Sequence, residues 1–169
     1  MRVDTRLAEL KFSTVAIERP EGTNIILGQC HFIKSVEDLY EAVSGGVPGA
    51  KFGLAFSESS GPCLVRRAGT DPELTDLAVK NLLKISAGHV FIVMLRNLYP
   101  INVLNSIKNV PEVCNIYCAT ANRVEVIVAE TDKGRGIVGV VDGNAPKGVE
   151  DEKASEERRL FLRKIGYKL

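Results

Sequence analysis

The stretch of sequence that decides the fold is His89-Val90-Phe91-Ile92-Val93-Met94-Leu95. Its six consecutive apolar residues leave neither face of a strand polar, which is typical of a strand buried on both faces. We therefore expect this segment to be central in its sheet. No wholly apolar run in the chain is longer, and a helix needs ~20 apolar residues to cross a bilayer, so no transmembrane span is predicted.

Further strands and helices are predicted on both sides of this run. Apolar patterning indicates strands over Leu10–Ile17, Asn24–Ile33, Lys51–Phe56, Cys63–Arg66, Asn115–Ala119, Arg123–Glu130 and Ile137–Val141. We expect the first two strands to pair antiparallel. Helices are expected after Ser35, which forms an S-x-x-D capping box with Asp38, after Asp71-Pro72 and after Pro100.

These elements predict one α/β (α+β) domain over residues 1–169, with a mixed β-sheet and strand–helix–strand units around the first and third helices. A charged C-terminal helix is expected at about residues 150–169. Leu160, Phe161 and Ile165 form its apolar stripe, and we expect the helix to dock on the domain through them.

The composition is that of an ordinary globular protein, with 45% hydrophobic and 25% charged residues. Lys and Arg total 22 against 21 Asp and Glu, so the net charge of +1 gives no reason to expect nucleic acid or an anionic membrane as a partner. The polar start, Met1 to Arg6, predicts no signal peptide. The four cysteines form no C-x-x-C pair and are expected to be free thiols, as in a cytoplasmic protein.

A glycine-rich segment, residues 134–141, matches the pattern G-x-G-x-x-G-x-V. It follows a predicted turn at Asp132-Lys133-Gly134 and leads into a strand, whereas a dinucleotide-binding motif would open a helix. The pattern therefore favours a glycine-rich hairpin. The absence of H-R-D and D-F-G motifs excludes a protein kinase, and no phosphate-binding loop, G-x-S-x-G or H-E-x-x-H motif occurs. The serine-rich loop after residue 56 offers hydrogen-bonding groups for a phosphate.

The chain has only two histidines, His31 and His89, so imidazole chemistry has two places to occur. If the strands flanking the first helix are parallel, His31 and Glu58 lie together at their carboxyl ends, where ligands bind in open α/β sheets. His89 begins the buried run, where a histidine is more often a core residue. Strand geometry thus favours His31 and leaves His89 open.

The segment from residue 85 to 131 is poor in charge and rich in asparagine. It holds six charged side chains and six of the nine asparagines of the chain. Neutral polar groups among apolar residues suit a hydrogen-bonding cleft, although asparagines also occupy caps and turns. We expect Asn102 and Asn122 to follow parallel strands at the same sheet edge as His31.

Several segments, in order along the chain, resemble the adenosine-specific kinase family, a small family of prokaryotic and mainly archaeal proteins. They are Gln29–Tyr40, Lys51–Phe56, Ala87–His89, Pro100–Asn105, Cys118–Asn122 and Gly139–Gly143. The resemblance spans roughly residues 10–149. It implies binding of adenosine or AMP, a stable phosphohistidine, and a homo-oligomer, which would be a trimer. Both histidines fall within matching segments.

The sequence and the resemblance together predict an adenosine- or AMP-binding phosphotransferase with a phosphohistidine intermediate at His31 or His89. A neutral imidazole can attack phosphorus, and ATP is the candidate phosphate donor. The alternative is a non-catalytic sensor or regulatory module that holds AMP or adenosine, because no ATP-binding motif is present.

Phosphoryl transfer also needs charge neutralisation. Lys34 and Arg96 are the candidate cations for the phosphate, together with the N-terminus of the helix at Ser35. Asn102 and Asn122 are the candidate partners of the adenine. Glu58 and Asp142 are the carboxylates expected to hold Mg²⁺, if the reaction uses it; the sequence does not identify a metal site.

Overall fold

The structure is a computed structural model that describes residues 10–169; the polar start, on which the prediction of no signal peptide depends, lies outside the described residues. The apolar run forms β5 (Val90–Arg96) in the middle of a five-stranded sheet. β5 pairs antiparallel with β2 (Thr23–Cys30) on one side and with β3 (Lys51–Ser57) on the other. Side chains from Val90 to Leu95 are at most 2% exposed, so the prediction of a central buried strand is confirmed.

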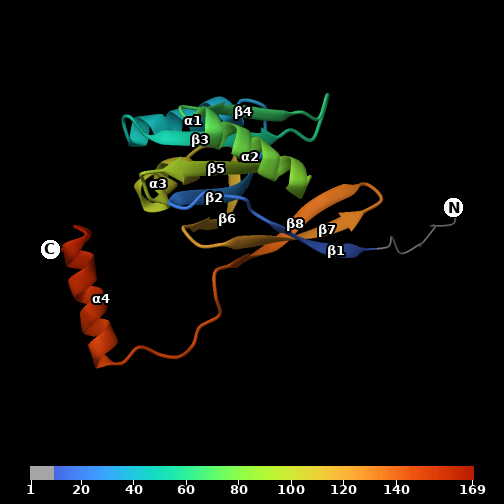
Figure 1. The fold of residues 1–169 in the computed structure, drawn as a ribbon. Helices are drawn as coiled ribbons and strands as arrows, with labels where there is room; N and C mark the ends of the chain where they lie inside the picture. The colour runs from blue at the N-terminus through green and yellow to red at the C-terminus, as the bar shows by residue number, and fades with distance from the viewer. Residues whose placement is uncertain (1–9) are drawn as a thin grey trace.

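The edges of this sheet are β4 (Val65–Gly69) and β6 (Val113–Thr120), in the order β4-β3-β5-β2-β6. A second sheet holds β1 (Lys11–Ala16), β7 (Val124–Thr131) and β8 (Gly134–Asp142), in the order β1-β7-β8 (Figure 1). The predicted pairing of the first two strands is wrong, because β1 pairs with β7. Both edges of β2 are taken by β5 and β6, so β1 has no edge of β2 to join.

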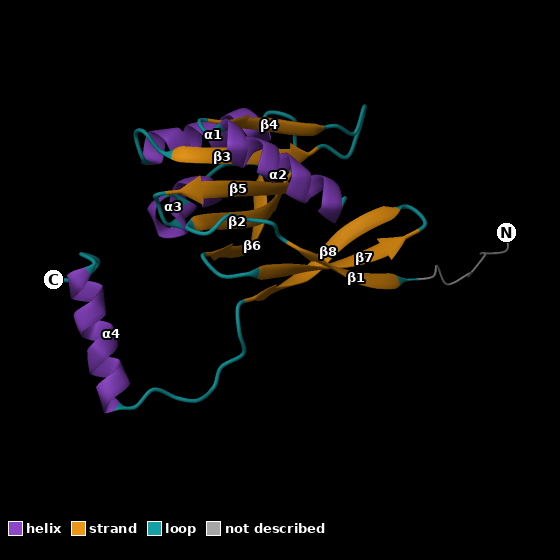
Figure 2. Ribbon diagram, viewed as in Figure 1, coloured by secondary structure: helices purple, strands orange, loops and turns teal. Residues whose placement is uncertain are grey.

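All helices except the C-terminal one cover the five-stranded sheet on its two faces (Figure 2). α1 (Ser35–Gly46) and α3 (Leu104–Lys108), which follows a 3₁₀ turn (Pro100–Asn102), form one hydrophobic core with Phe91, Val93 and Leu95 of β5. α2 (Pro72–Ile85) and the second sheet form the other core with Ile92 and Met94. The alternation along β5 therefore supplies side chains to two cores at once.

The single α+β domain with a C-terminal helix is confirmed, but every strand pair is antiparallel among the described residues. β2 and β3 run in the same direction, as a strand–helix–strand unit around α1 requires. They are not neighbours, because β5 lies between them and is antiparallel to both. The predicted mixed sheet is thus replaced by a split unit in which no parallel pair forms.

The C-terminal helix α4 (Glu152–Lys164) stands apart from the domain on an extended segment (Figure 1). Its predicted docking is not what the structure has: none of its residues is buried, and Leu160 and Phe161 are each 57% exposed. The ring of Tyr167, just beyond the helix, meets Tyr99 edge-on at 6.5 Å. No helix within residues 10–169 is long and apolar enough to cross a membrane.

α2 lies unusually close to β3, because Gly53 has no side chain. A Cβ atom built on Gly53 would lie 2.1 Å from the backbone nitrogen of Thr75. The helix begins at Pro72, after Asp71 accepts a hydrogen bond from the Leu74 amide (3.2 Å), and it ends at Ser86 in the left-handed conformation. This close approach fixes the position of α2 and of everything its C-terminal end contacts.

We expect Gly53→Ala to lower the free energy of unfolding by about 3 kcal/mol, because the new methyl group meets backbone atoms that cannot move independently. Urea denaturation followed by circular dichroism measures this change. Gly136→Ala in β8 is the matched control, since no atom of residues 10–169 lies within 4 Å of its added Cβ. Equal effects of the two substitutions would contradict the close approach of α2.

Candidate functional site

Three strand termini meet at one end of the five-stranded sheet. β2 and β3 end there and β5 begins there, so His31, Glu58 and His89 lie at this end of the sheet. The His89 amide donates to the Ser57 carbonyl (2.7 Å), and the Cys30 amide donates to the His89 carbonyl (3.0 Å). His31 and Glu58 lie at the same end of the sheet, as expected, because β2 and β3 run in the same direction, but these strands are not the parallel neighbours that the prediction assumed.

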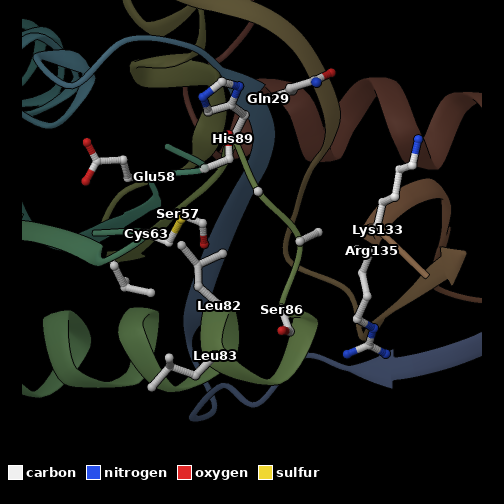
Figure 3. Close-up of a pocket in the computed structure, with 15 residues that line it drawn as sticks. Gln29, Ser57, Glu58, Cys63, Leu82, Leu83, Ser86, His89, Lys133 and Arg135 are labelled. Carbon is white, nitrogen blue, oxygen red and sulfur yellow. The ribbon is translucent and has the colours of Figure 1, made fainter. Parts of the chain in front are cut away.

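A pocket of about 480 Å³ opens at this end of the sheet, between the end of α2 and the β7–β8 hairpin (Figure 3). Its apolar wall is formed by Val65, Leu82, Leu83 and Ala87. Its polar groups come from Gln29, Ser57, Glu58, Ser59, Ser86 and His89, and its basic side chains are Lys133 and Arg135. An apolar wall with a few polar and charged groups is the usual composition of a small-molecule site.

His89 is held in this pocket by the backbone of the sheet. Its φ of 57° is in the left-handed region, which few non-glycine residues adopt, and both of its backbone hydrogen bonds go to neighbouring strand ends. The half-buried imidazole stacks on Phe56, with ring centroids 6.1 Å apart and planes 12° from parallel. Within residues 10–169 neither ring nitrogen takes a hydrogen-bonding partner. His31 is exposed and lies outside the pocket lining.

Among the described residues, Glu58 is the one carboxylate lining the pocket. Its Oε2 accepts from Nη2 (2.7 Å) and Nε (3.2 Å) of Arg66, and its side chain is only 12% exposed. The Ser59 side chain lies against Gly88, where a Cβ would come within 2.5 Å of it. The serine-rich loop is thereby fixed beside His89.

The two cations predicted to bind phosphate are already paired with carboxylates. Lys34 contacts Asp38 and the buried Glu112, and these hydrogen bonds, chiefly the one to Asp38, raise the pKa of the Lys34 ammonium. Arg96 contacts Asp71 (2.7 Å) and Glu73 (2.9 Å). Hydrogen bonding to Glu73 is the main cause of the raised pKa of its guanidinium. Neither cation lines the pocket.

The predicted capping box of the first helix is also wrong. The helix is capped at Lys34 without a side-chain bond, and Ser35 is the first helical residue. The Ser35 hydroxyl is fully buried and donates to the carbonyls of His31 (2.9 Å) and Phe32 (2.6 Å). It therefore does not face a ligand.

Four other predicted residues lie at the opposite end of the sheet, because β5 and β6 run antiparallel to β2. They are Arg96, Asn102, Asn122 and Asp142. Arg96 pairs with Thr23 at the beginning of β2, and Asn122 follows the end of β6. Asn102 accepts from the Tyr99 amide (2.9 Å), so it closes a turn. Asp142 accepts from Asn122 (3.0 Å) and from Thr120 (2.8 Å). Asn102 and Asn122 thus hold local turns and a strand end together.

Of the nine predicted site residues, only Glu58 and His89 line the pocket. Glu58 and Asp142 lie at opposite ends of the sheet and cannot bind one ion together. Within residues 10–169, no group of three His, Cys, Asp or Glu side chains could hold a metal ion. Lys133 and Arg135 were missed as site residues. The turn and hairpin that carry them were predicted, but nothing in their sequence indicated that the hairpin reaches α2.

The fold is an α+β domain, and a pocket of the size of a small-molecule site opens at one end of its five-stranded sheet. The chain belongs to the adenosine-specific kinase family, whose description is "Adenosine specific kinase" and which it matches over residues 15–168. The crystal structure of the PH1918 protein from Pyrococcus horikoshii OT3 is 50% identical to this chain, with a TM-score of 0.92. The match covers 95% of this chain and 99% of that one. No curated protein matches the chain. Membership suggests an adenosine kinase-like activity.

All four cysteines are free, and they offer a direct test of the pocket. Cys63 and Cys114 are exposed, and Cys63 lines the pocket. Burial raises the pKa of Cys30 to about 12 and of Cys118 to about 11, so both thiols stay protonated at pH 8. We expect a thiol reagent at pH 8 to label Cys63 and Cys114 rapidly and to leave Cys30 and Cys118 unlabelled.

A molecule bound in the pocket should then protect one of the two exposed thiols. We expect saturating AMP to slow labelling of Cys63 several-fold, while Cys114 keeps its rate and serves as the internal control. Peptide mass mapping assigns each label, and Cys63→Ser verifies the assignment. Protection of Cys114 alone, or of neither thiol, would place the ligand elsewhere.

Proposed function

We propose that this protein is a cytoplasmic phosphotransferase acting on adenosine or AMP, and that His89 carries the phosphoryl group. The observation that supports this most strongly is the placement of the chain's two histidines: His89 lines the pocket, and His31 does not. The family match supports the nucleoside as the ligand. Free thiols agree with a reducing compartment.

The pocket has the size and the chemistry for a nucleoside. Its volume of about 480 Å³ falls in the ordinary range of small-molecule sites, roughly 300–1,000 Å³. Val65, Leu82 and Leu83 offer an apolar surface for the purine. Ser57, Ser59 and Gln29 offer hydrogen-bonding groups for ribose hydroxyls.

The transfer proceeds in two steps in this proposal. A neutral ring nitrogen of His89 attacks the terminal phosphorus of a nucleoside triphosphate such as ATP. The N–P bond forms while the P–O bond to the departing nucleoside diphosphate breaks. A hydroxyl oxygen of adenosine then attacks the same phosphorus, the N–P bond breaks, and the hydroxyl proton leaves to water. The sheet holds the imidazole in place through the His89 backbone, and this positioning is the main contribution of the fold.

Mg²⁺ enters this proposal only together with the phosphates of the donor. Among residues 10–169, Glu58 is the single carboxylate lining the pocket, and it is held by Arg66, so this part of the chain offers one carboxylate to such an ion. Nucleotide-bound Mg²⁺ commonly keeps few protein ligands, and one carboxylate fits that pattern.

We expect His89→Ala to abolish both the phosphorylated protein and phosphoryl transfer to adenosine, because the nucleophile is lost. His31→Ala is the matched control and should retain both. Intact mass spectrometry under non-acidic conditions detects the addition of one phosphate, and labelled ATP follows transfer. Phosphate on His31, or full activity of His89→Ala, would contradict the mechanism.

The sensor alternative predicts a different outcome of the same experiment. Calorimetry would detect AMP binding to the unmodified protein, while no phosphate would appear on either histidine and ATP would not be consumed. This result would assign the pocket to a regulatory module without chemistry.

We further propose that the chain acts as a homo-oligomer, with a trimer as the state implied by the family resemblance. Apolar groups remain uncovered on α4 and on the domain edge it approaches: Phe161 is 57% and Ile101 65% exposed. Both groups line a groove of about 910 Å³ between the helix and the domain. A second copy of the chain carries both surfaces, so exchange or stacking of the C-terminal arms would cover them in one closed assembly.

A chain cut after Glu150 should sediment as a smaller species than the full chain, because the apolar surface of α4 is removed. Phe161→Glu in the full chain should have the same effect through charge in the contact, and Lys153→Ala on the charged side of α4 should have none. Sedimentation velocity measures all four proteins. An unchanged sedimentation coefficient for the shortened chain, after correction for mass, would contradict a role of α4 in assembly.

A further inference from the structure

Two basic residues reach the pocket from the second sheet, and their surroundings differ. Lys133 and Arg135 flank the tip of the β7–β8 hairpin, across the pocket from Glu58 (Figure 3). Their side chains extend in opposite directions in Figure 3. Arg135 extends toward the end of α2, and Lys133 toward the end of the pocket where Gln29 and His89 lie.

Arg135 is held by the protein through both of its terminal nitrogens. Its Nη1 donates to the Lys84 carbonyl in the last turn of α2 (3.3 Å), and its Nη2 donates to the Ser13 hydroxyl in β1 (3.1 Å). Its Nε lies 3.3 Å from a carboxylate oxygen of Glu130. Arg135 therefore fastens the hairpin to the helix and to its own sheet. A carboxylate already balances its charge.

Lys133 is in the opposite situation. Its backbone amide donates to the Thr131 hydroxyl (3.2 Å), which shapes the turn, but its ammonium contacts no carboxylate within residues 10–169. The other charged groups of the pocket are balanced, since Glu58 pairs with Arg66 and Arg135 with Glu130. Lys133 thus gives the pocket its one unbalanced charge among the described residues, and that charge is positive.

We propose that Lys133 binds the phosphate of the pocket's ligand, so that the site selects phosphorylated over unphosphorylated small molecules. An ammonium is a compact charge with three donors, which suits a phosphate oxygen. The identity of the ligand as a nucleotide rests on the function proposed above. The placement of its phosphate beside the hairpin rests only on the charges of the pocket.

The test compares AMP with adenosine, which differ only in the phosphate. We expect Lys133→Gln to weaken AMP binding about tenfold, as loss of a charged hydrogen bond does, and to change adenosine binding less than about twofold. Lys133→Arg should restore most of the AMP affinity. Lys108→Gln on α3, on the other face of the five-stranded sheet, is the matched control. Calorimetry at constant ionic strength measures each affinity.

A second readout does not depend on the nucleoside. Because the chain has only two histidines, ¹⁵N spectra of the imidazoles contain two sets of ring signals. We expect pyrophosphate to move the His89 signals in the unmodified protein, to leave the His31 signals in place, and to lose this effect in Lys133→Gln.

The outcomes separate this inference from the proposed function. If neither AMP nor adenosine binds but pyrophosphate moves His89 only when Lys133 is present, the nucleoside function fails and the phosphate site stands. If AMP and adenosine bind equally well, or Lys133→Gln changes neither AMP binding nor the pyrophosphate response, the phosphate site is overturned while nucleoside binding stands. Failure of pyrophosphate and of AMP to bind the unmodified protein overturns both.

Discussion

β5 forms hydrogen bonds along both of its edges and is buried on both of its faces, and the rest of the domain is arranged to satisfy these two demands. β2 and β3 occupy its edges. α1 and α3 cover one face, while α2 and the second sheet cover the other. A strand without a polar face would otherwise expose apolar side chains and unpaired backbone groups, both of which are costly. His89 directly precedes this strand, so the same constraint places its imidazole at the end of the sheet where the pocket opens.

The elements were largely predictable from sequence, but their neighbours were not. Periodicity and turn residues located the strands and the main helices, because burial of one face leaves a repeating signal. The same signal says nothing about which strand lies beside which. β1 was expected to pair with β2, yet both edges of β2 are taken by strands from later in the chain. β5 and β6 both run antiparallel to β2, so Asn102 and Asn122, which follow them, lie at the end of the sheet opposite to the one expected.

The candidate site was predicted less completely than the fold, for a reason visible at Lys34 and Arg96. A basic side chain near a strand end resembles a phosphate ligand until its partners are known, and those partners are distant in sequence. Glu112 reaches Lys34 from the beginning of β6, and Asp71 reaches Arg96 from the cap of α2. Lys133 shows the converse, because its proposed role depends on its ammonium having no carboxylate partner within residues 10–169. Charge balance is a property of the folded neighbourhood and cannot be read from single residues.

The pocket is assembled across two sheets, with the histidine on one and the basic hairpin on the other, so its geometry depends on the joint between them. The C-terminal half of α2 provides that joint. The buried side-chain amide of Asn81 accepts a hydrogen bond from the Glu18 amide and donates one to the Glu18 carbonyl, each at 2.8 Å. The Lys84 carbonyl accepts a hydrogen bond from Arg135. The Glu18 carboxylate contacts Lys80 and Lys84, and these hydrogen bonds lower its pKa to about 2. A lowered carboxylate pKa means that the stabilising contribution is present at neutral pH and is lost as the pH falls toward 2. Gly53 allows α2 to pack closely on β3, so the sheet that carries His89 and the sheet that carries Lys133 both contact the same helix. The distance across the pocket is therefore set by backbone packing and by the hydrogen bonds that α2 makes with Glu18 and Arg135.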